Sequence, residues 1–348
     1  MSRRYLRRVA AATALVVGAG LVGFTVSPAG AQSSDGFDAE SIASEVDPAV
    51  AVVNITLAGG RGQGVGTGIV ITSDGEILTN NHVVENAGRI RVRIGGAGRA
   101  YTAEVLGYNA KEDVALLKVD GVSNLETVKT DETVSVGESV VALGNGGGAD
   151  GDPDATSGSV RAVGETIEVA DTAGFQTLRN LIRVDASLEP GDSGGPLVDA
   201  DGEVIGMNAA ASSGGFRLRT GSGYAIPIRT ALTIADQIRS GAGSGDTHVG
   251  ERAFLGVSIQ SARGGLRERG GAQSGAVVAD VRSDSAADDA GIQAGDEIVS
   301  LAGKRIDSID DLTSALAPHH PRDRVEVAWV DDGGERHTAT VTLAGAPS

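Results

Sequence analysis

The chain has 348 residues, of which 41% are hydrophobic and 22% charged, which is typical of globular proteins and longer than one average domain. Its formal net charge of −17 argues against nucleic acid or an anionic membrane as a main partner. The absence of cysteine excludes disulfides, thiol nucleophiles and cysteine-ligated zinc. The 52 glycines have no collagen period and therefore indicate many tight turns between short strands.

Residues 1–31 have the pattern of an export signal. Four arginines stand within the first eight residues, residues 9–26 form an uncharged apolar run, and Ala29–Ala31 offers a small-residue cleavage site. Sec export is the default interpretation, because the pair Arg3-Arg4 only weakly resembles a twin-arginine signal. The alternative is a retained membrane anchor, since the apolar run is at the short limit for a membrane span.

A polar leader is predicted over residues 32–44 and a first domain over residues 45–240. Its short apolar segments are separated by turn signals such as Asp74-Gly75, which predicts a β-barrel or sandwich. Apolar residues at helical spacing predict a helix over 228–240, and Gly-rich composition predicts surface loops over 145–159 and 212–223. The predicted strands cover residues 51–56, 68–72, 76–79, 90–94, 102–106, 114–119, 139–143, 160–163, 181–184, 197–198 and 204–208.

The remaining residues predict a linker and a second domain. Residues 241–250 have linker composition, and the second domain covers residues 251–345. Its predicted strands are 255–259, 276–281, 297–301, 325–330 and 337–343, and its predicted short helices are 285–290 and 311–316.

Ser193 stands in the string Glu-Pro-Gly-Asp-Ser-Gly-Gly-Pro-Leu, which covers residues 189–197. A serine hydroxyl becomes a good nucleophile only when a base takes its proton and hydrogen-bond donors receive the oxyanion. The glycines let the backbone turn sharply and direct N–H groups, including those of Gly191 and Ser193, into one small space. A Gly-rich turn between two strands is the alternative interpretation of this string alone.

The base and its carboxylate partner come from upstream segments. His82 is the only histidine before residue 248, so it must be the base if the first domain is catalytically complete. Asp113 begins an apolar strand and is the best candidate for the carboxylate that orients the imidazole. Glu112 and Asp120 are alternatives of similar chemistry.

Together these segments resemble the HtrA/Deg family of trypsin-like serine proteases, with the closest likeness to secreted actinobacterial members. The matching strings are Thr-Asn-Asn-His-Val-Val at 79–84, Asp-Val-Ala-Leu-Leu-Lys-Val at 113–119 and Gly-Asp-Ser-Gly-Gly-Pro-Leu at 191–197. The second domain resembles the PDZ domain of that family in Ala-Phe-Leu-Gly-Val at 253–257. The resemblance covers about residues 45–345.

The resemblance implies a mainly β fold, in which a trypsin-like double β-barrel with the triad in its cleft is followed by a C-terminal PDZ domain. Ser193 would attack a peptide carbonyl, His82 would transfer the proton, and Asp113 would orient His82. The oxyanion hole would be formed at Gly191, Asp192 and Ser193. No metal or cofactor is needed.

The resemblance also implies binding sites for polypeptide. Ser187 stands where trypsins carry an aspartate, and Leu188 and Ala211 would line the pocket for the residue before the scissile bond, so we expect Val, Ala or Leu there. The loop Phe254, Leu255, Gly256 and Val257 would bind the C-terminal carboxylate of a peptide that adds as a strand. An ordinary strand is the alternative for this loop.

Two departures from the family pattern affect these expectations. Many HtrA proteins have Asn where this chain has Asp192. A single PDZ domain makes large cages less expected than the trimer usual in the family, and the leader contains only one aromatic residue, Phe37, for trimer contacts.

The sequence therefore predicts an exported, ATP-independent serine endopeptidase for misfolded or exposed polypeptides, located in the cell envelope or the medium. The first alternative is a non-proteolytic peptide-binding protein or chaperone whose triad is inactive at rest. Another acyl-transfer hydrolase, such as an esterase, is disfavoured because the flanking βαβ pattern of a nucleophile elbow is missing.

Overall fold

The computed structural model describes residues 37–57, 62–85, 87–95, 98–145, 153–170, 175–209, 222–241, 243, 246–259 and 276–345. The predicted export signal and Ala211 lie outside the described residues. Across the described segments, no helix is both long enough and apolar enough to cross a membrane.

The first barrel closes through its fifth and sixth strands. Its six strands are joined in the order β5-β4-β1-β2-β3-β6, and β6 pairs back with β5. Successive side chains of a strand point to opposite faces, so apolar residues at alternate positions fill the barrel interior. In β4, for example, Ile90 and Val92 are buried while Arg89 and Arg91 are exposed. The strands are β1 (Val50–Leu57), β2 (Gln63–Val70), β3 (Glu76–Thr79), β4 (Ala87–Ile94), β5 (Tyr101–Asn109) and β6 (Val114–Val119), and β14 (Thr247–Val249) extends the sheet beside β5.

The second barrel has the same kind of closure. Its order is β11-β8-β9-β10-β13-β12, with β12 pairing back to β11, while β7 (Lys129–Thr130) adds parallel to β12. The six barrel strands are β8 (Ser139–Gly144), β9 (Asp154–Ala170), β10 (Phe175–Val184), β11 (Pro196–Val198), β12 (Glu203–Asn208) and β13 (Gly223–Pro227).

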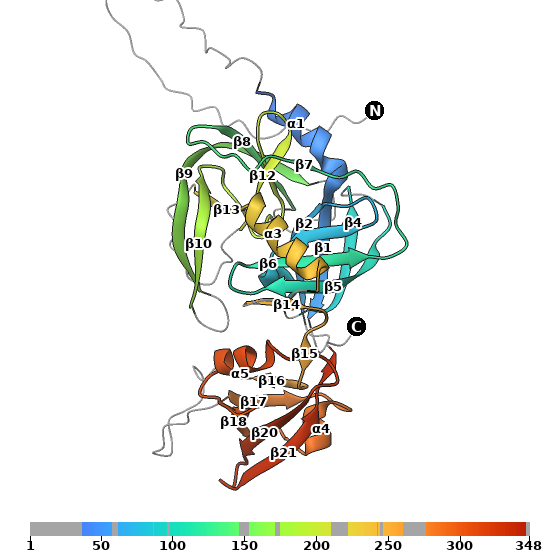
Figure 1. Ribbon diagram of the computed structural model, residues 1–348, viewed down its shortest axis with the longest axis vertical. Coiled ribbons are helices and arrows are strands. Elements are labelled where there is room, and N and C mark those ends of the chain that lie inside the picture. The colour runs from blue at the N-terminus through green and yellow to red at the C-terminus, as the bar shows by residue number, and fades with distance from the viewer. Residues whose placement is uncertain are drawn as a thin grey trace, which may run out of the picture. The chain divides into compact units, whose positions relative to one another are not determined.

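A shared apolar core joins the two barrels. It combines side chains such as Leu116 of the first barrel and Leu143 of the second with the buried face of helix α3 (Ile228–Arg239). This helix lies across both barrels in Figure 1. Helix α1 (Ala39–Val46) packs into the same core and leads through the short 3₁₀ helix η1 (Asp47–Ala49) into β1. Because one core serves both barrels, the surfaces between them are held in a fixed relation.

The C-terminal domain has its own core and sheet. The sheet order is β16-β17-β18-β20-β21, with β19 beside β18, and among the described strands β16 lies at one edge. Its elements are β15 (Ala253–Phe254), β16 (Val257–Ile259), β17 (Ala276–Val281), α4 (Ala286–Ala290), β18 (Glu297–Leu301), β19 (Lys304–Arg305), α5 (Ile309–Leu316), β20 (Arg324–Val330), β21 (Arg336–Thr342) and β22 (Ala344–Gly345). Buried Leu255, Val278, Ile298 and Val327 belong to the core of this domain.

The predicted mainly β class with a double barrel is confirmed, and four local expectations differ from the structure. Part of the predicted leader forms α1, because Ile42, Ala43 and Val46 share one buried face. The predicted loop 145–159 already contains the start of β9, which pairs with β8 from Asp154 onward. Residues 247–249 of the predicted linker form β14, and residue 223 begins β13. The domain boundaries stay predictions.

Candidate active site

His82 lies in the short helix α2 (Asn81–Val84), directly after β3. Its Nδ1 is 2.8 Å from Oδ2 of Asp113, and its backbone N–H donates to Oδ1 of the same carboxylate at 2.9 Å. The Asp113 side chain is only 4% exposed, whereas that of His82 is 29% exposed. A carboxylate at Nδ1 favours the tautomer with Nδ1–H, which leaves Nε2 as the proton acceptor.

The backbone of Asp113 is held in an unusual conformation. Its φ is +55°, in the left-handed region that a non-glycine residue adopts only at a cost in free energy. Its carbonyl accepts hydrogen bonds from Asn80 Nδ2 at 3.0 Å and from the Asn81 backbone at 3.2 Å. The two asparagines directly before His82 therefore hold Asp113 in position. In the sequence, the only signal of these two asparagines is their place in the string Thr-Asn-Asn-His-Val-Val.

The turn that carries Ser193 is tied to the first barrel through Thr67 of β2. The Thr67 backbone N–H donates to the Ser193 carbonyl at 2.8 Å, and its hydroxyl donates to the Gly191 carbonyl at 2.7 Å. The same hydroxyl accepts the Asn145 N–H at 2.9 Å. Thr67 is fully buried, so these bonds are shielded from water. Its place in a Gly-Val-Gly-Thr-Gly string was the only signal of this role in the sequence.

Gly194 shows why this turn needs glycine. Its φ is +87°, and a side-chain carbon there would overlap the Thr67 carbonyl and the Thr79 hydroxyl. Its N–H donates to the Asn208 carbonyl at 2.8 Å, so the backbone is pinned where no side chain fits.

The segments that carry His82 and Ser193 meet at Gly66 of β2. A carbon added to Gly66 would lie 2.7 Å from Cγ1 of Val83, which follows His82, and 3.3 Å from the Ser193 carbonyl oxygen. The barrel packing therefore brings the segment of Ser193 close to the segment of His82, 111 positions earlier in the chain. Ser193 itself is 5% exposed.

Asp192 is engaged in a local turn. Its Oδ2 accepts the Glu189 N–H at 2.7 Å, and its own N–H donates to the Glu189 carbonyl at 3.0 Å. An N–H directed at Glu189 is not directed at an oxyanion. We therefore drop Asp192 from the expected oxyanion hole and keep the backbone N–H groups of Gly191 and Ser193 as the proposed donors.

Two of the three residues predicted to line the substrate pocket, Ser187 and Leu188, lie within the described residues. Ser187 is exposed, and Leu188 is half-buried against the apolar interior of the second barrel. A carbon added to Gly223 would lie 2.6 Å from Leu188 Cγ, so this leucine packs against the start of β13. Leu188 thus gives this wall of the second barrel an uncharged, apolar surface.

Arg252 reaches the helix of His82 from the segment after β14. Its guanidinium donates to the Asn81 side-chain oxygen, and its carbon Cζ lies 3.7 Å from the ring centroid of Tyr108. Burial lowers the pKa of Arg252, while Tyr108 and Glu85 act in the opposite direction, and burial also raises the pKa of Tyr108. No motif in the sequence indicates this role of Arg252, because Asn81 is 171 positions away.

In the predicted carboxylate loop, two backbone carbonyl groups accept hydrogen bonds from the rest of the domain. The Leu255 carbonyl accepts the Ala287 N–H at 2.8 Å, and the Gly256 carbonyl accepts the Arg282 N–H at 2.9 Å. Because a trans peptide places its C=O and N–H on opposite sides, the N–H groups of Gly256 and Val257 face away from these partners. Leu255 is buried in the domain core, Phe254 lies in β15, and Val257 begins the edge strand β16.

Comparisons with known proteins identify two domains, in the same order along the chain as in the structure. A model of the trypsin-like peptidase domain matches residues 66–207, and a PDZ domain model matches residues 253–343. The fold and the site thus define a trypsin-like peptidase domain followed by a PDZ domain. Within that class the chain is similar to proteases of the HtrA/DegP type.

A probable periplasmic serine endoprotease DegP-like of Ectopseudomonas mendocina is 38% identical over 299 residues, covering 83% of this chain and 59% of the relative. The protein of the same name from Halomonas elongata is 37% identical, covering 81% and 57%. The chain therefore spans less than two thirds of the length of these curated relatives. Both are proteobacterial and do not support the expected closer likeness to actinobacterial members.

Two solved structures agree with the fold. The HtrA-type protease AlgW with tripeptide is 28% identical with a TM-score of 0.51, over 88% of this chain and 97% of that chain. The same protease with decapeptide is 26% identical with a TM-score of 0.50, over 89% and 99%.

Proposed function

We propose that the protein is an exported, ATP-independent serine endopeptidase that hydrolyses peptide bonds of misfolded or exposed polypeptides. The observation that carries this proposal is the buried Asp113 carboxylate, which contacts both the ring and the backbone of His82. The curated relatives are named serine endoproteases, which supports the same reaction class.

The proposed reaction follows from the site. Ser193 Oγ attacks the scissile carbonyl while His82 Nε2 takes its proton, and the Asp113 carboxylate stabilises the imidazolium that forms. The backbone N–H groups of Gly191 and Ser193 receive the oxyanion. His82 then gives the proton to the leaving amine, and water attacks the acyl ester by the same route in reverse.

Substrate choice is proposed to follow from Leu188 and Ala211. An uncharged pocket wall leaves a buried Lys or Arg side chain without a counter-ion, so Val, Ala or Leu is favoured before the scissile bond. Digestion of a peptide library, followed by mass spectrometry of the cut sites, tests this. Cleavage mainly after Lys or Arg would contradict it.

The PDZ domain is proposed to bind peptide C-termini. The outward N–H groups at Gly256 and Val257 would receive the terminal carboxylate, and the peptide would pair with the edge strand β16. This supports capture of polypeptide ends, with a homo-trimer as the proposed assembly. Export to the cell envelope or medium is proposed from the signal pattern and from the periplasmic naming of the relatives.

Labelling by a fluorophosphonate tests the enzyme against the peptide-binding alternative. The full chain, His82→Ala and Ser193→Ala are each labelled with and without a synthetic C-terminal peptide. Labelling of the wild type alone supports an activated serine with His82 as its base, and labelling that needs the peptide adds a switch through the PDZ domain. Absence of labelling in every folded sample would favour the non-proteolytic binding protein.

A further inference from the structure

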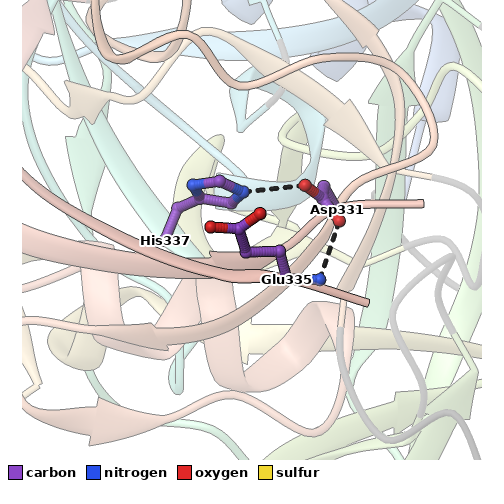
Figure 2. Close-up of side chains that lie close together, drawn as sticks. All are labelled: Asp331, Glu335 and His337. Carbon is purple, nitrogen blue, oxygen red and sulfur yellow. Dashed lines mark hydrogen bonds and ion pairs between the residues drawn. The ribbon is translucent and has the colours of Figure 1, made fainter. Parts of the chain in front are cut away.

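The hairpin of β20 and β21 carries a group of three side chains outside the peptidase site. Asp331, Glu335 and His337 each offer one ligand atom, and these atoms lie within 4.8 Å of one another. Figure 2 shows the Glu335 carboxylate beside the imidazole and the Asp331 carboxylate in line with its ring nitrogen. We propose that this group binds a divalent transition-metal ion of the Zn²⁺ type.

Strand alternation explains how the group forms. His337 lies opposite Trp329 in the register of the hairpin, and Glu335 and Asp331 each stand two positions toward the turn, so all four side chains lie on one face. The Asp331 N–H donates to the Glu335 carbonyl at 3.0 Å, which closes the turn that brings the two acids together.

Two of the three ligands are held in place before any ion arrives. Asp331 Oδ1 accepts the Glu335 N–H at 2.8 Å, and Oδ2 lies 2.8 Å from His337 Nε2. The His337 ring stacks on Trp329 with 5.4 Å between centroids, and Trp329 is 6% exposed and therefore firmly packed. The third ligand, Glu335, is exposed and can rotate without disturbing the core.

The donor set selects the class of ion. One imidazole nitrogen with two carboxylate oxygens suits Zn²⁺ and its first-row neighbours, whereas Mg²⁺ and Ca²⁺ prefer oxygen ligands alone. Ligand atoms around a tetrahedral Zn²⁺ are about 3.4 Å apart, so atoms that already lie within 4.8 Å of one another can reach this spacing by rotation of the exposed glutamate. Solvent would occupy the fourth position.

The local charge favours a cation. Asp331 Oδ2 lies 2.8 Å from His337 Nε2, and the Glu335 carboxylate belongs to the same group. Two carboxylates thus lie beside one imidazole at the surface of the domain. The group also lies on the β20–β21 hairpin at the edge of the sheet opposite β16, so an ion there would not occupy the strand proposed to pair with peptide.

The chain contains its own reporter for this site. Trp329 is the only tryptophan in the sequence, so tryptophan fluorescence reads out the ring that stacks on His337. The full chain, stripped with EDTA and desalted, is titrated with ZnCl₂ while fluorescence and calorimetric heat are recorded. We expect a saturable fluorescence change that calcium chloride does not produce, with one Zn²⁺ bound per hairpin.

Three variants distinguish Zn²⁺ binding at this group from unspecific binding to other acidic residues. Glu335→Gln keeps the size of an exposed side chain and should weaken Zn²⁺ binding by about tenfold or more, and His337→Gln should abolish the fluorescence change. The matched control is His319→Gln, which removes the histidine of the His319–Asp323 pair in the same domain, whose Nδ1 and Oδ2 are 3.4 Å apart. That pair belongs to no three-ligand group among the described residues, so its loss should leave the affinity unchanged.

Thermal unfolding of each metal-free variant checks that the domain still folds. A wild-type titration without saturable fluorescence change overturns the proposal. Equal affinities for wild type, Glu335→Gln and His337→Gln also overturn it, because binding would then come from other acidic groups.

Discussion

Asp113 contacts His82 through both of its carboxylate oxygens, one at the ring nitrogen Nδ1 and one at the backbone N–H. A single acid therefore orients the imidazole and also fixes the start of the helix that carries it. The left-handed backbone of Asp113 and the hydrogen bonds from Asn80 and Asn81 to its carbonyl belong to the same arrangement.

We expect Asp113→Asn to lower kcat by about 10⁴-fold, because an amide no longer favours the productive tautomer of His82 or stabilises its imidazolium. Steady-state hydrolysis of a peptide with an apolar residue before the scissile bond measures this. Glu112→Gln, the adjacent acid considered in the sequence, is the control and should keep wild-type kcat. Equal losses in both variants would show that Asp113 is not the orienting carboxylate.

Thr67→Val should impair both folding and activity. The hydroxyl bonds the Gly191 carbonyl and the Asn145 N–H in a buried place, and a methyl group leaves both without their partner. We expect a loss of about 1–3 kcal/mol in the free energy of unfolding, measured with urea, and a lower kcat because the Gly191 peptide is released. Thr102→Val, at an exposed position of β5, should change the unfolding free energy by less than about 0.5 kcal/mol. Similar losses in the two variants would contradict this account.

Arg252→Met tests the contact between the segment after β14 and helix α2, which carries His82. Loss of the hydrogen bond to Asn81 and of the stacking on Tyr108 should loosen α2 and lower kcat by about 10- to 100-fold, with little change in KM. The rate of fluorophosphonate labelling, which needs no peptide in the cleft, should fall in parallel. Arg99→Met removes another arginine over an aromatic ring, at Tyr101, and should leave both rates unchanged. A change in KM alone would refute a positioning role for Arg252.

His248 should make stability depend on pH. Its ring stacks between Tyr108 and His320, its Nε2 is 3.0 Å from the Glu251 carbonyl oxygen, and burial lowers its pKa below 6.5. The charges of His320 and Arg252 act in the same direction.

Because the folded chain holds this imidazole neutral, the unfolded state binds more protons just below pH 6.5. The stability that this neutral ring contributes is complete above that pH and is lost as the pH falls toward the folded pKa. Urea unfolding between about pH 7 and pH 5 should therefore show a shallower decline for His248→Phe than for the wild type. His319→Phe is the control and should follow the wild-type curve, and an unchanged slope in His248→Phe would contradict the prediction.

The sequence predicted the short strands and the candidate residues His82, Asp113 and Ser193 because each signal is local, whereas the double barrel was implied by the resemblance to the HtrA/Deg family. Short alternating strands follow from the residues within each strand, and the three strings are each read from consecutive positions. Helix α1 was missed because its leader is polar overall, and its buried face appears only against the shared core.

The tertiary structure alone decided what supports those residues. Thr67 lies more than a hundred positions from the turn that it holds, and Arg252 lies 171 positions from Asn81, so no local pattern connects them. A sequence determines which side chains are available and which strands form. Only the closure and packing of the barrels determine which buried donors and acceptors meet, because each must find a partner once water is excluded.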